Sequence, residues 1–593
     1  MLGNSNMARI VADVRVGDAL DGLYLGIRER ERSADLLTRL KRHAGDMPLR
    51  RSASGIFIPF PLAGQLDQID GIDLRWTSEA RQFVANRVTA GETFHANVEA
   101  LHRLKAAGPI AARHEIADSD GLNILDAHQV VNVAAMTAKG GLGLCVFDEQ
   151  GAGKTVTLIF AFDLLASRNE ADRVLIIAPK SMVPEWPKDI ARFRPDLYRV
   201  AIVSGSAREK RRILQEDPDV IVTNFETALS MEVELTALLR SRPGRTVLAV
   251  DESFFIKSLD AQRTRAIRRL REWCGRAFVL CGTPAPNSPR DLVQQFSLVD
   301  FGLAFDGVDV PQDRTEAAPV VQEVIEKRGL FIRHLKAQVL PDLPSKSFQR
   351  IFVPLAPEQG RLYGQLLNDL VADVEKTDER QFGREFANFL ARRSALLQLC
   401  SNPSAIFPEY QETPAKLAAL DALVDQLVAA GEKIVIWSFY TKSVSRIVER
   451  YARHGAMRYD GEVSDVDTRR DTVRRFQDDD CSMILVANPA AAGAGLTLHR
   501  ARIAIYESLS NQAAHYLQSL DRIHRRGQTR DVEYLVLLGD KTIETQEYER
   551  LIAKEAASQS LLGDVVSQPV TRDTFLGEAK AAIALFSANA ASR

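Results

Sequence analysis

Two parts of the chain share one hydrophobic pattern, in which short, continuous apolar runs alternate with longer stretches of helical spacing. Continuous runs are typical of parallel strands buried on both faces, whereas half-exposed strands alternate apolar and polar residues. The pattern therefore predicts two α/β blocks. The runs are 141–149, 174–181, 200–205, 220–226, 247–253 and 277–284 in the first block, and 433–439, 483–489, 502–508 and 533–538 in the second.

The amino-terminal part differs in texture, with apolar runs at 22–27 and 55–62 on either side of a helical segment at 32–43. This outline indicates a small α+β module. The fold class we expect is α/β, with two parallel-sheet lobes in tandem, helical extensions and this module. The expected divisions are an accessory module at 1–118, the first lobe at 119–300, a linker or helical insertion at 301–345, the second lobe at 346–545 and a helical tail at 546–593.

Composition narrows the class of protein. The 593 residues carry 76 Lys and Arg against 78 Asp and Glu, a net charge of −2. This balance argues against a general polycation, although a nucleic-acid groove needs only a local basic face. No apolar run is long enough to cross a bilayer, and the five cysteines form neither a CxxC pair nor a cluster with histidine. We expect a cytoplasmic protein with no membrane partner, zinc site or disulfide framework.

The segment FDEQGAGKT, at 147–155, has the form of a phosphate-binding loop between a strand and a helix. Backbone N–H groups of such a turn point at a phosphate chain, Lys154 reaches the β- and γ-phosphates, and the Thr155 hydroxyl ligates magnesium. The full pattern has Gly where this chain has Asp148, so a glycine-containing turn with a surface lysine is the alternative. The other residues expected around the phosphates are Gln150, Gly151, Ala152 and Gly153.

The pair Asp251 and Glu252, which ends the apolar run VLAV, is a second chemical signal. At the tip of a neighbouring parallel strand, Asp251 can hold the metal while Glu252 polarises the attacking water. An acidic helix N-terminus is the alternative for the pair alone. Together, loop and pair predict ATP and Mg2+ as cofactors and Lys154 and Glu252 as catalytic residues.

Further motifs stand before, between and after these two segments. They are LDAHQ (125–129), IIAPKSMVPEWPKDIARF (176–193), VIVTNFET (220–227), LCGTPAPN (280–287), FIRHLKAQVLPDLPSK (331–346), WSFYTKS (437–443), YDGEVSDVDTRRDTVRRFQ (459–477), AAAGAGLTL (490–498) and QSLDRIHRRGQ (518–528). In this order they resemble the SWI/SNF-type ATPases, the double-stranded-DNA translocase branch of helicase superfamily two. The resemblance implies two RecA-like lobes and an ATP-dependent motor. The segment 331–346 is unusually specific, because ordinary ATPases have no reason to carry it.

The resemblance also assigns residues to the nucleotide. Gln129 would read the adenine edge, since a side-chain amide both donates and accepts. Gly495, whose backbone is left free to meet the other lobe, and Gln518 would complete the site. Arg522 and Arg525 fall three apart on an expected helix, hence on one face, and would act as arginine fingers on the transferring phosphoryl group. A basic solvated helix is the alternative for this pair.

By the same resemblance the partner is DNA, with duplex preferred, and the protein is nucleoid-associated. Contacts to phosphates predict little sequence preference and strong salt sensitivity. Single strands and DNA–RNA hybrids stay open, and Trp437 is equally consistent with a core position. The setting we expect is bacterial or phage genome maintenance, recombination or defence, with protein subunits of a larger complex as further partners. The candidate DNA contacts are Lys180, Ser181, Thr223 and Asn224 in the first lobe and Trp437 and Thr497 in the second.

Three other functions stay open: a strand-separating helicase, a catalytically weak DNA-binding or assembly subunit, and a nucleotide-binding module without nucleic acid. The wording of the 518–528 and 331–346 motifs argues against the first, and the presence of Lys154, Thr155, the carboxylates and the arginines argues against the second. The segment AVDESFFIKS (249–258) adds a question, because Ser253 and Phe254 stand where many nucleic-acid motors carry Ala and His. Phenylalanine cannot make a histidine-type hydrogen bond, so we expect a relay between DNA and ATP to run here through packing against the 280–287 motif.

Overall fold

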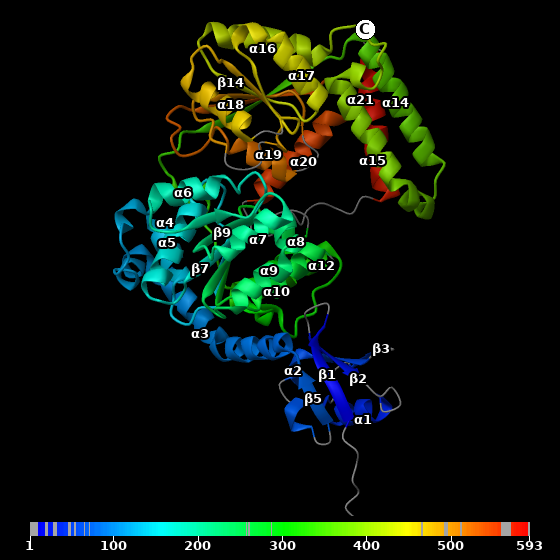
Figure 1. The fold of residues 1–593 in the computed structure, drawn as a ribbon. Helices are drawn as coiled ribbons and strands as arrows, with labels where there is room; N and C mark the ends of the chain where they lie inside the picture. The colour runs from blue at the N-terminus through cyan, green and yellow to red at the C-terminus, as the bar shows by residue number, and fades with distance from the viewer. Residues whose placement is uncertain are drawn as a thin grey trace, which may run out of the picture. The chain divides into compact units, whose positions relative to one another are not determined.

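The computed structural model describes residues 10–17, 22–27, 33–44, 49–52, 55–63, 66–69, 72–256, 258, 261–285, 288–463, 466–491, 496–509, 513–558 and 571–590. The chain divides into two compact units, Met1–Leu335 and Lys336–Arg593, and Figure 1 shows the elements of each. Among the described residues, no helix has both the length and the apolar character that crossing a membrane requires.

The first unit begins with a five-stranded sheet of order β3-β4-β2-β1-β5. β1 and β5 are parallel, and the other neighbours are antiparallel. One face of the sheet packs on two helices through Leu36, Leu40 and Leu62, which confirms the predicted α+β module. The elements are β1 (Ile10–Val16), β2 (Gly22–Ile27), α1 (Ser33–Ala44), β3 (Arg50–Ser52), β4 (Gly55–Pro59), α2 (Phe60–Ala63) and β5 (Ile72–Trp76).

The first unit also contains a seven-stranded, wholly parallel sheet of order β12-β6-β11-β10-β7-β9-β8. Each of the six predicted runs overlaps one of the strands β6 to β11, so the predicted parallel sheet is confirmed. β7 and β10 are buried at every residue, as strands covered on both faces must be. The strands are β6 (Gly143–Val146), β7 (Arg173–Ala178), β8 (Val200–Ile202), β9 (Val220–Asn224), β10 (Thr246–Asp251), β11 (Arg276–Leu280) and β12 (Phe331–Ile332).

Helices surround this sheet (Figure 1). The longest, α3, begins at its N-cap Thr77, whose side chain accepts the Ala80 N–H. Arg87 of α3 is buried and pairs with Glu272 at 3.0 Å, which holds α3 against the sheet's helical layer. The helices are α3 (Ser78–Glu115), α4 (Ala127–Met136), α5 (Lys154–Ser167), α6 (Glu185–Phe193), α7 (Ala207–Gln215), α8 (Phe225–Ser230), α9 (Glu232–Arg240), α10 (Gln262–Arg271), α11 (Arg290–Asp300) and α12 (Arg314–Arg328).

The second unit contains a six-stranded parallel sheet of order β13-β18-β17-β14-β16-β15. The four predicted runs form β14, β16, β17 and β18. The pattern missed β13, which is mostly exposed along its length, and β15, which has only three residues. The strands are β13 (Lys346–Val353), β14 (Ile434–Trp437), β15 (Met457–Tyr459), β16 (Ile484–Ala487), β17 (Ile503–Tyr506) and β18 (Val532–Gly539).

Three helices of the second unit, α14, α15 and α21, lie side by side (Figure 1). Phe382 and Phe389 of α15 pack with Phe575 of α21, with centroids of Phe382 and Phe389 5.4 Å apart. The helices of this unit are α13 (Lys336–Val339), α14 (Pro357–Glu375), α15 (Glu379–Ser401), α16 (Ala415–Ala429), α17 (Thr441–Arg450), α18 (Val466–Asp478), α19 (Ala513–Leu520), α20 (Ile543–Ser558) and α21 (Arg572–Ala590).

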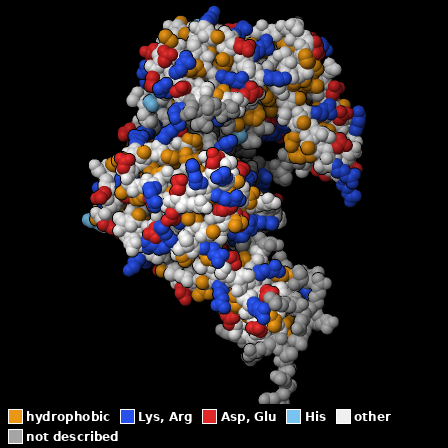
Figure 2. Space-filling view, in the orientation of Figure 1, with side chains coloured by type: hydrophobic (Ala, Val, Ile, Leu, Met, Phe, Trp, Pro, Cys, Tyr) orange, Lys and Arg blue, Asp and Glu red, His pale blue; other side chains and the backbone are white. Residues whose placement is uncertain are grey.

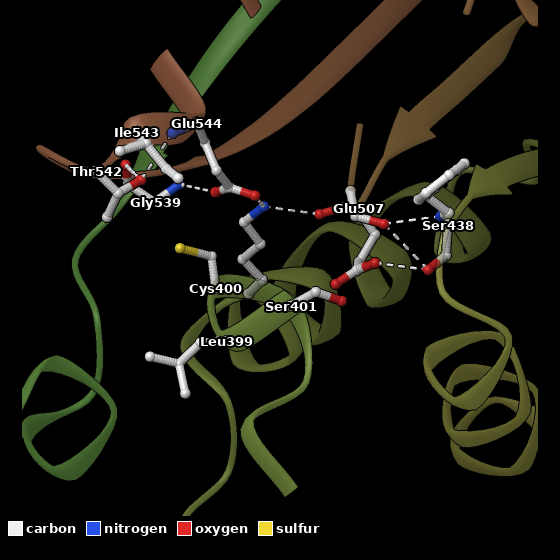
Figure 3. Close-up of polar contacts among 12 residues, drawn as sticks. Leu399, Cys400, Ser401, Ser438, Glu507, Gly539, Thr542, Ile543 and Glu544 are labelled. Atoms are coloured by element: carbon white, nitrogen blue, oxygen red, sulfur yellow. Dashed lines mark hydrogen bonds and ion pairs between the residues drawn. The ribbon is translucent and has the colours of Figure 1, made fainter. Parts of the chain in front are cut away.

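A buried ion pair joins α16 to α20. The Lys416 ammonium donates to Glu544 Oε1 at 2.6 Å and to the Glu507 carbonyl at 2.9 Å, and the Gly539 N–H donates to the other Glu544 oxygen (Figure 3). The two side chains are 0% and 2% exposed. Burial raises the pKa of Glu544, and the Lys416 ammonium opposes that rise. Because both side chains are buried away from water, each charge is stabilised mainly by the other.

Lys416→Met leaves the Glu544 carboxylate buried without its cation, and we expect it to lower the free energy of unfolding by about 3–5 kcal/mol. Lys416→Met with Glu544→Gln should recover much of that loss, because no charge stays buried. The control is Lys580→Met, which breaks an exposed pair with Glu375 and should cost at most about 1 kcal/mol. Urea unfolding measures all three, and equal losses in the two single variants would contradict the expectation.

Candidate active site

The loops that follow β6, β11 and β10 meet at one edge of the seven-stranded sheet. The three strands are neighbours and run parallel, so their carboxyl ends lie together. The loop after β6 is the glycine-rich 147–153, β11 leads into Cys281, and β10 ends in Asp251 and Glu252. Segments far apart in the sequence are thereby assembled into one site.

Gly153 begins α5 with a left-handed φ of 88°. A Cβ at this position would lie 2.2 Å from Gln129 Nε2. The left-handed φ and this close approach both favour glycine here. The next residue, Lys154, turns its ammonium back over the loop and donates to the carbonyls of Asp148 at 2.8 Å and Glu149 at 3.3 Å. Loop, helix N-terminus and lysine form the arrangement that holds a phosphate chain.

The two predicted carboxylates lie beside this loop and are nearly buried. Glu252 adopts a left-handed φ of 51°, which turns it away from the strand direction, and its N–H donates to Asp251 Oδ1 at 3.0 Å. Gln150 of the loop donates to Glu252 Oε1 at 2.7 Å. One side chain therefore joins the phosphate loop directly to the carboxylate expected to polarise water.

The electrostatics of the pair favour a cation. Burial and the adjacent Glu252 carboxylate raise the pKa of Asp251 to about 7, and the Lys154 ammonium opposes that rise. Asp251 is buried with too little positive charge around it, which suits the binding of a divalent cation. Mg2+ prefers oxygen ligands. Thr155 lies one residue after Lys154 at the start of α5, so its hydroxyl and the Asp251 carboxylate are a fitting donor set.

Helix α4 packs against the loop from the side of Gln129. The Gln129 Oε1 accepts the Asp126 N–H at 2.9 Å, and its Nε2 donates to the Gly153 carbonyl at 3.2 Å. His128 lies within 2.8 Å of the Ala152 carbonyl through Nε2. The structure thus places Gln129 on the loop, and its role toward adenine stays a prediction.

Sequence reasoning missed Gln295, a fully buried residue of α11. Its Oε1 accepts the Ser253 hydroxyl, and its Nε2 donates to the Pro284 carbonyl. Gln295 therefore joins the segment after Glu252 to the 280–287 motif, which partly explains a Ser at position 253. The signal was hidden because Gln295 lies in a helix with no motif of its own. Asn287 of that motif lies outside the described residues.

Of the predicted nucleic-acid residues of this unit, Lys180 and Ser181 follow β7, and Thr223 and Asn224 end β9, its parallel neighbour. Lys180 and Ser181 are exposed, and Asn224 is half-buried, with its Oδ1 accepting the Thr227 N–H as the cap of α8. The Thr223 side chain is fully buried, so it presents no surface for a ligand.

In the second unit, the expected helical placement of Arg522 and Arg525 is wrong, because α19 ends before them and 521–527 forms turns. The last carbonyl of α19 accepts the Tyr534 hydroxyl, which takes up a group that a continuing helix would use. The two arginines still meet, because Nη1 of each donates to the Leu496 carbonyl, at 3.5 Å from Arg522 and 2.8 Å from Arg525.

Thr497 lies beside the two arginines, because the neighbouring Leu498 N–H donates to the Arg522 carbonyl at 2.9 Å. Gln518 is buried in α19, and Trp437 is fully buried beside Tyr506, so Trp437 occupies the core position that its pattern also allowed. The Thr497 carbonyl accepts Gln477 Nε2 at 2.9 Å. Gly495 lies outside the described residues.

The surface carries no broad patch of one sign on the visible face. Figure 2 shows Lys and Arg side chains interspersed with Asp and Glu over both units. This mixture agrees with the net charge of −2, so a nucleic-acid contact on this face would depend on local groups.

Two family models match the chain, the SNF2-related domain over residues 126–405 and the helicase conserved C-terminal domain over residues 415–527. The Bacillus subtilis (strain 168) protein YwqA is 28% identical over 449 residues, which cover 72% of this chain and 47% of that protein. The Xenopus laevis SWI/SNF-related matrix-associated actin-dependent regulator of chromatin subfamily A-like protein 1 is 27% identical over 417 residues, 67% of this chain and 40% of that protein. The chain spans less than half the length of these two relatives.

Among solved structures, the Sulfolobus solfataricus SWI2/SNF2 ATPase core in complex with dsDNA is similar at 23% identity with a TM-score of 0.34. The match covers 74% of this chain and 92% of that chain. So low a TM-score carries no argument, and the fold assignment rests on the two parallel sheets and the family models.

Asp251→Asn removes the carboxyl whose pKa in the folded chain is about 7, well above its ordinary value of about 4. A carboxyl with a raised pKa favours folding while it is protonated, so this contribution is lost as the pH rises from about 4 to about 7. In magnesium-free buffer we expect Asp251→Asn to be more stable than the wild type by on the order of a few kcal/mol at pH 8, and by less at pH 5.

Denaturant unfolding at pH 5, 6, 7 and 8 measures this difference. The control is Asp309→Asn, which changes an exposed carboxyl of the same unit and should leave the pH profile of stability unchanged. A profile of Asp251→Asn that runs parallel to the wild type would show that Asp251 ionises without cost.

Proposed function

This chain contains an SNF2-related domain and a helicase conserved C-terminal domain, and from that premise we propose that it is a DNA-dependent ATPase that moves along duplex DNA. The observation that carries the proposal is the contact of Gln150 with Glu252, which joins the phosphate loop to the water-activating carboxylate. ATP hydrolysis needs these two groups at one phosphate.

Each first-unit residue predicted around the phosphates or the metal ion then has a role in ATP hydrolysis. The α5 N-terminus and the Lys154 ammonium bind the phosphates, and they neutralise charge that grows during transfer. Thr155 and Asp251 would hold Mg2+, which supplies Lewis-acid polarisation of the phosphate when bound. Glu252, held by Gln150, orients the attacking water and takes its proton. The loop residues Gly151, Ala152 and Gly153 present backbone N–H groups rather than side chains.

For Arg522 and Arg525 we propose that they stabilise charge on the transferring phosphoryl group. Their convergence on the Leu496 carbonyl supports joint action. Because they belong to the second unit and the phosphate loop to the first, hydrolysis would require both units. This dependence is what would couple turnover to movement.

The track we propose is the backbone of duplex DNA, held with little sequence preference. Lys180, Ser181 and Asn224 in the first unit and the Thr497 segment in the second supply polar groups for phosphates. The setting we propose is genome maintenance, recombination or defence in a bacterium or phage. A strand-separating helicase would use the same residues, and strand displacement from a partial duplex distinguishes it from a translocase, which instead displaces a third strand from an intact duplex.

The first test records the ATPase rate without nucleic acid and with single-stranded, duplex and forked DNA. We expect duplex DNA to stimulate turnover at least about tenfold at low salt, and the stimulation to fall steeply with added salt. Lys154→Ala should remove ATP binding, and Glu252→Gln should keep binding while lowering turnover by about 10²- to 10³-fold. No stimulation by any DNA would sink the autonomous translocase.

An aromatic stack lies between the proposed DNA contact and the ATP site. Phe225, which follows Asn224, has its ring centroid 5.1 Å from that of Phe255, and Phe255 stacks on Phe254 at 4.6 Å. Burial raises the pKa of the Cys281 thiol, and the Phe254 backbone is among the groups that oppose that rise. We therefore propose that the relay from DNA runs from Phe225 through the rings of Phe255 and Phe254, which lie in the segment that follows Glu252.

Phe255→Ala interrupts the stack, and we expect it to reduce DNA stimulation about three- to tenfold while KM for ATP and the rate without DNA stay within about twofold. Phe254→His should keep ATP binding and likewise change mainly the stimulation. The control is Phe193→Ala, an aromatic truncation at the far end of α6. A stimulation ratio in Phe255→Ala equal to that of the control would refute the relay.

A further inference from the structure

Asp148 is a buried carboxylate that the phosphate chemistry does not use. Its residue is 0% exposed, although it stands in a loop. Oδ2 accepts Asn132 Nδ2 at 2.6 Å, and Oδ1 accepts both the backbone N–H of His334 at 2.8 Å and its ring Nδ1 at 2.9 Å. A buried charge needs several donors, and these come from two distant parts of the chain.

His334, which supplies two of these donors, lies two residues after β12, the last strand of the first unit. β12 pairs with β6, and the pairing continues into the loop, where the Phe147 N–H donates to the Ile332 carbonyl at 2.8 Å and the Glu149 N–H to the His334 carbonyl at 3.0 Å. His334 therefore grips the loop twice, through its backbone and its ring.

The His334 ring has a defined donor. A carboxylate only accepts hydrogen bonds, so Nδ1 carries the proton that points at Asp148. The charged groups and titratable rings around it are Asp148, the preceding Arg333, and His128, whose ring lies edge-on at 5.4 Å. His128 uses Nε2 toward the Ala152 carbonyl and leaves Asp148 to His334.

Asp148 connects this grip to the nucleotide lysine. Its carboxylate is held by His334, and its own carbonyl accepts the Lys154 ammonium at 2.8 Å. A shift of Asp148 would displace the group that locates Lys154. We propose that His334 is a positioning residue for ATP, which through Asp148 sets the loop and Lys154 in the arrangement that receives the phosphates. This inference rests on the proposed ATP site.

The test compares two substitutions at one position in the full chain. His334→Leu removes the ring donor, whereas His334→Asn restores an N–H at the same number of bonds from the backbone. With a fluorescent ATP analogue and no DNA, we expect Kd to rise about tenfold in His334→Leu and to stay within about threefold of the wild type in His334→Asn. KM for ATP should follow Kd, with kcat at saturating ATP within about twofold. His102→Leu, exposed on α3, is the control.

Other results overturn the proposal. An unchanged Kd in His334→Leu, or a lowered Tm and kcat with unchanged KM, makes the histidine a stability element only. A Kd in His334→Asn as weak as in His334→Leu rejects the donor role. If His334→Leu folds poorly, Asp148→Asn replaces it and must weaken the analogue in the same direction. Failure of the wild type to bind any nucleotide would instead overturn the proposed function, and this inference with it.

Discussion

Parallel pairing of β6, β11 and β10 is the constraint on which the candidate site depends. It places the phosphate loop, the 280–287 motif and the carboxylate pair at one edge of a buried sheet. An antiparallel arrangement would send alternate loops to opposite edges. The backbone therefore assembles the groups, and side chains such as Gln150 and Gln295 adjust the fit between them.

Two buried carboxyl groups, Asp148 and Asp251, lie at this edge of the sheet, and they differ in their hydrogen-bond partners. Asp148 accepts hydrogen bonds from Asn132 of α4 and from His334, which follows β12. Asp251 lacks an equal set, and burial beside Glu252 raises its pKa. The contrast separates a carboxylate that organises the loop from one suited to take up a cation.

The second unit also contains buried charged groups. Lys416 and Glu544 hold α16 and α20 together through a buried ion pair, while Arg522 and Arg525 both donate to the Leu496 carbonyl. Guanidinium groups tolerate such partial burial because their charge is delocalised and weakly hydrated. The unit thus combines a buried ion pair with two arginines that converge on one backbone carbonyl.

Continuous apolar runs were enough to predict both parallel sheets, because burial on two faces demands them whatever the neighbouring strands are. The glycine turn, Lys154 and the carboxylate pair could also be predicted, since their chemistry needs those residue types at strand ends. The roles of Asp148, His334 and Gln295 could not be predicted, because each contacts partners that are far away in the sequence and that only the tertiary structure brings close. The turn that carries Arg522 and Arg525 was also decided by tertiary structure, where Tyr534 claims the carbonyl that a helix would have used. Local pattern by itself determined the buried strands and the reactive groups, because burial and chemistry restrict the residue types there. Long-range contacts decided which polar side chains hold those groups in place.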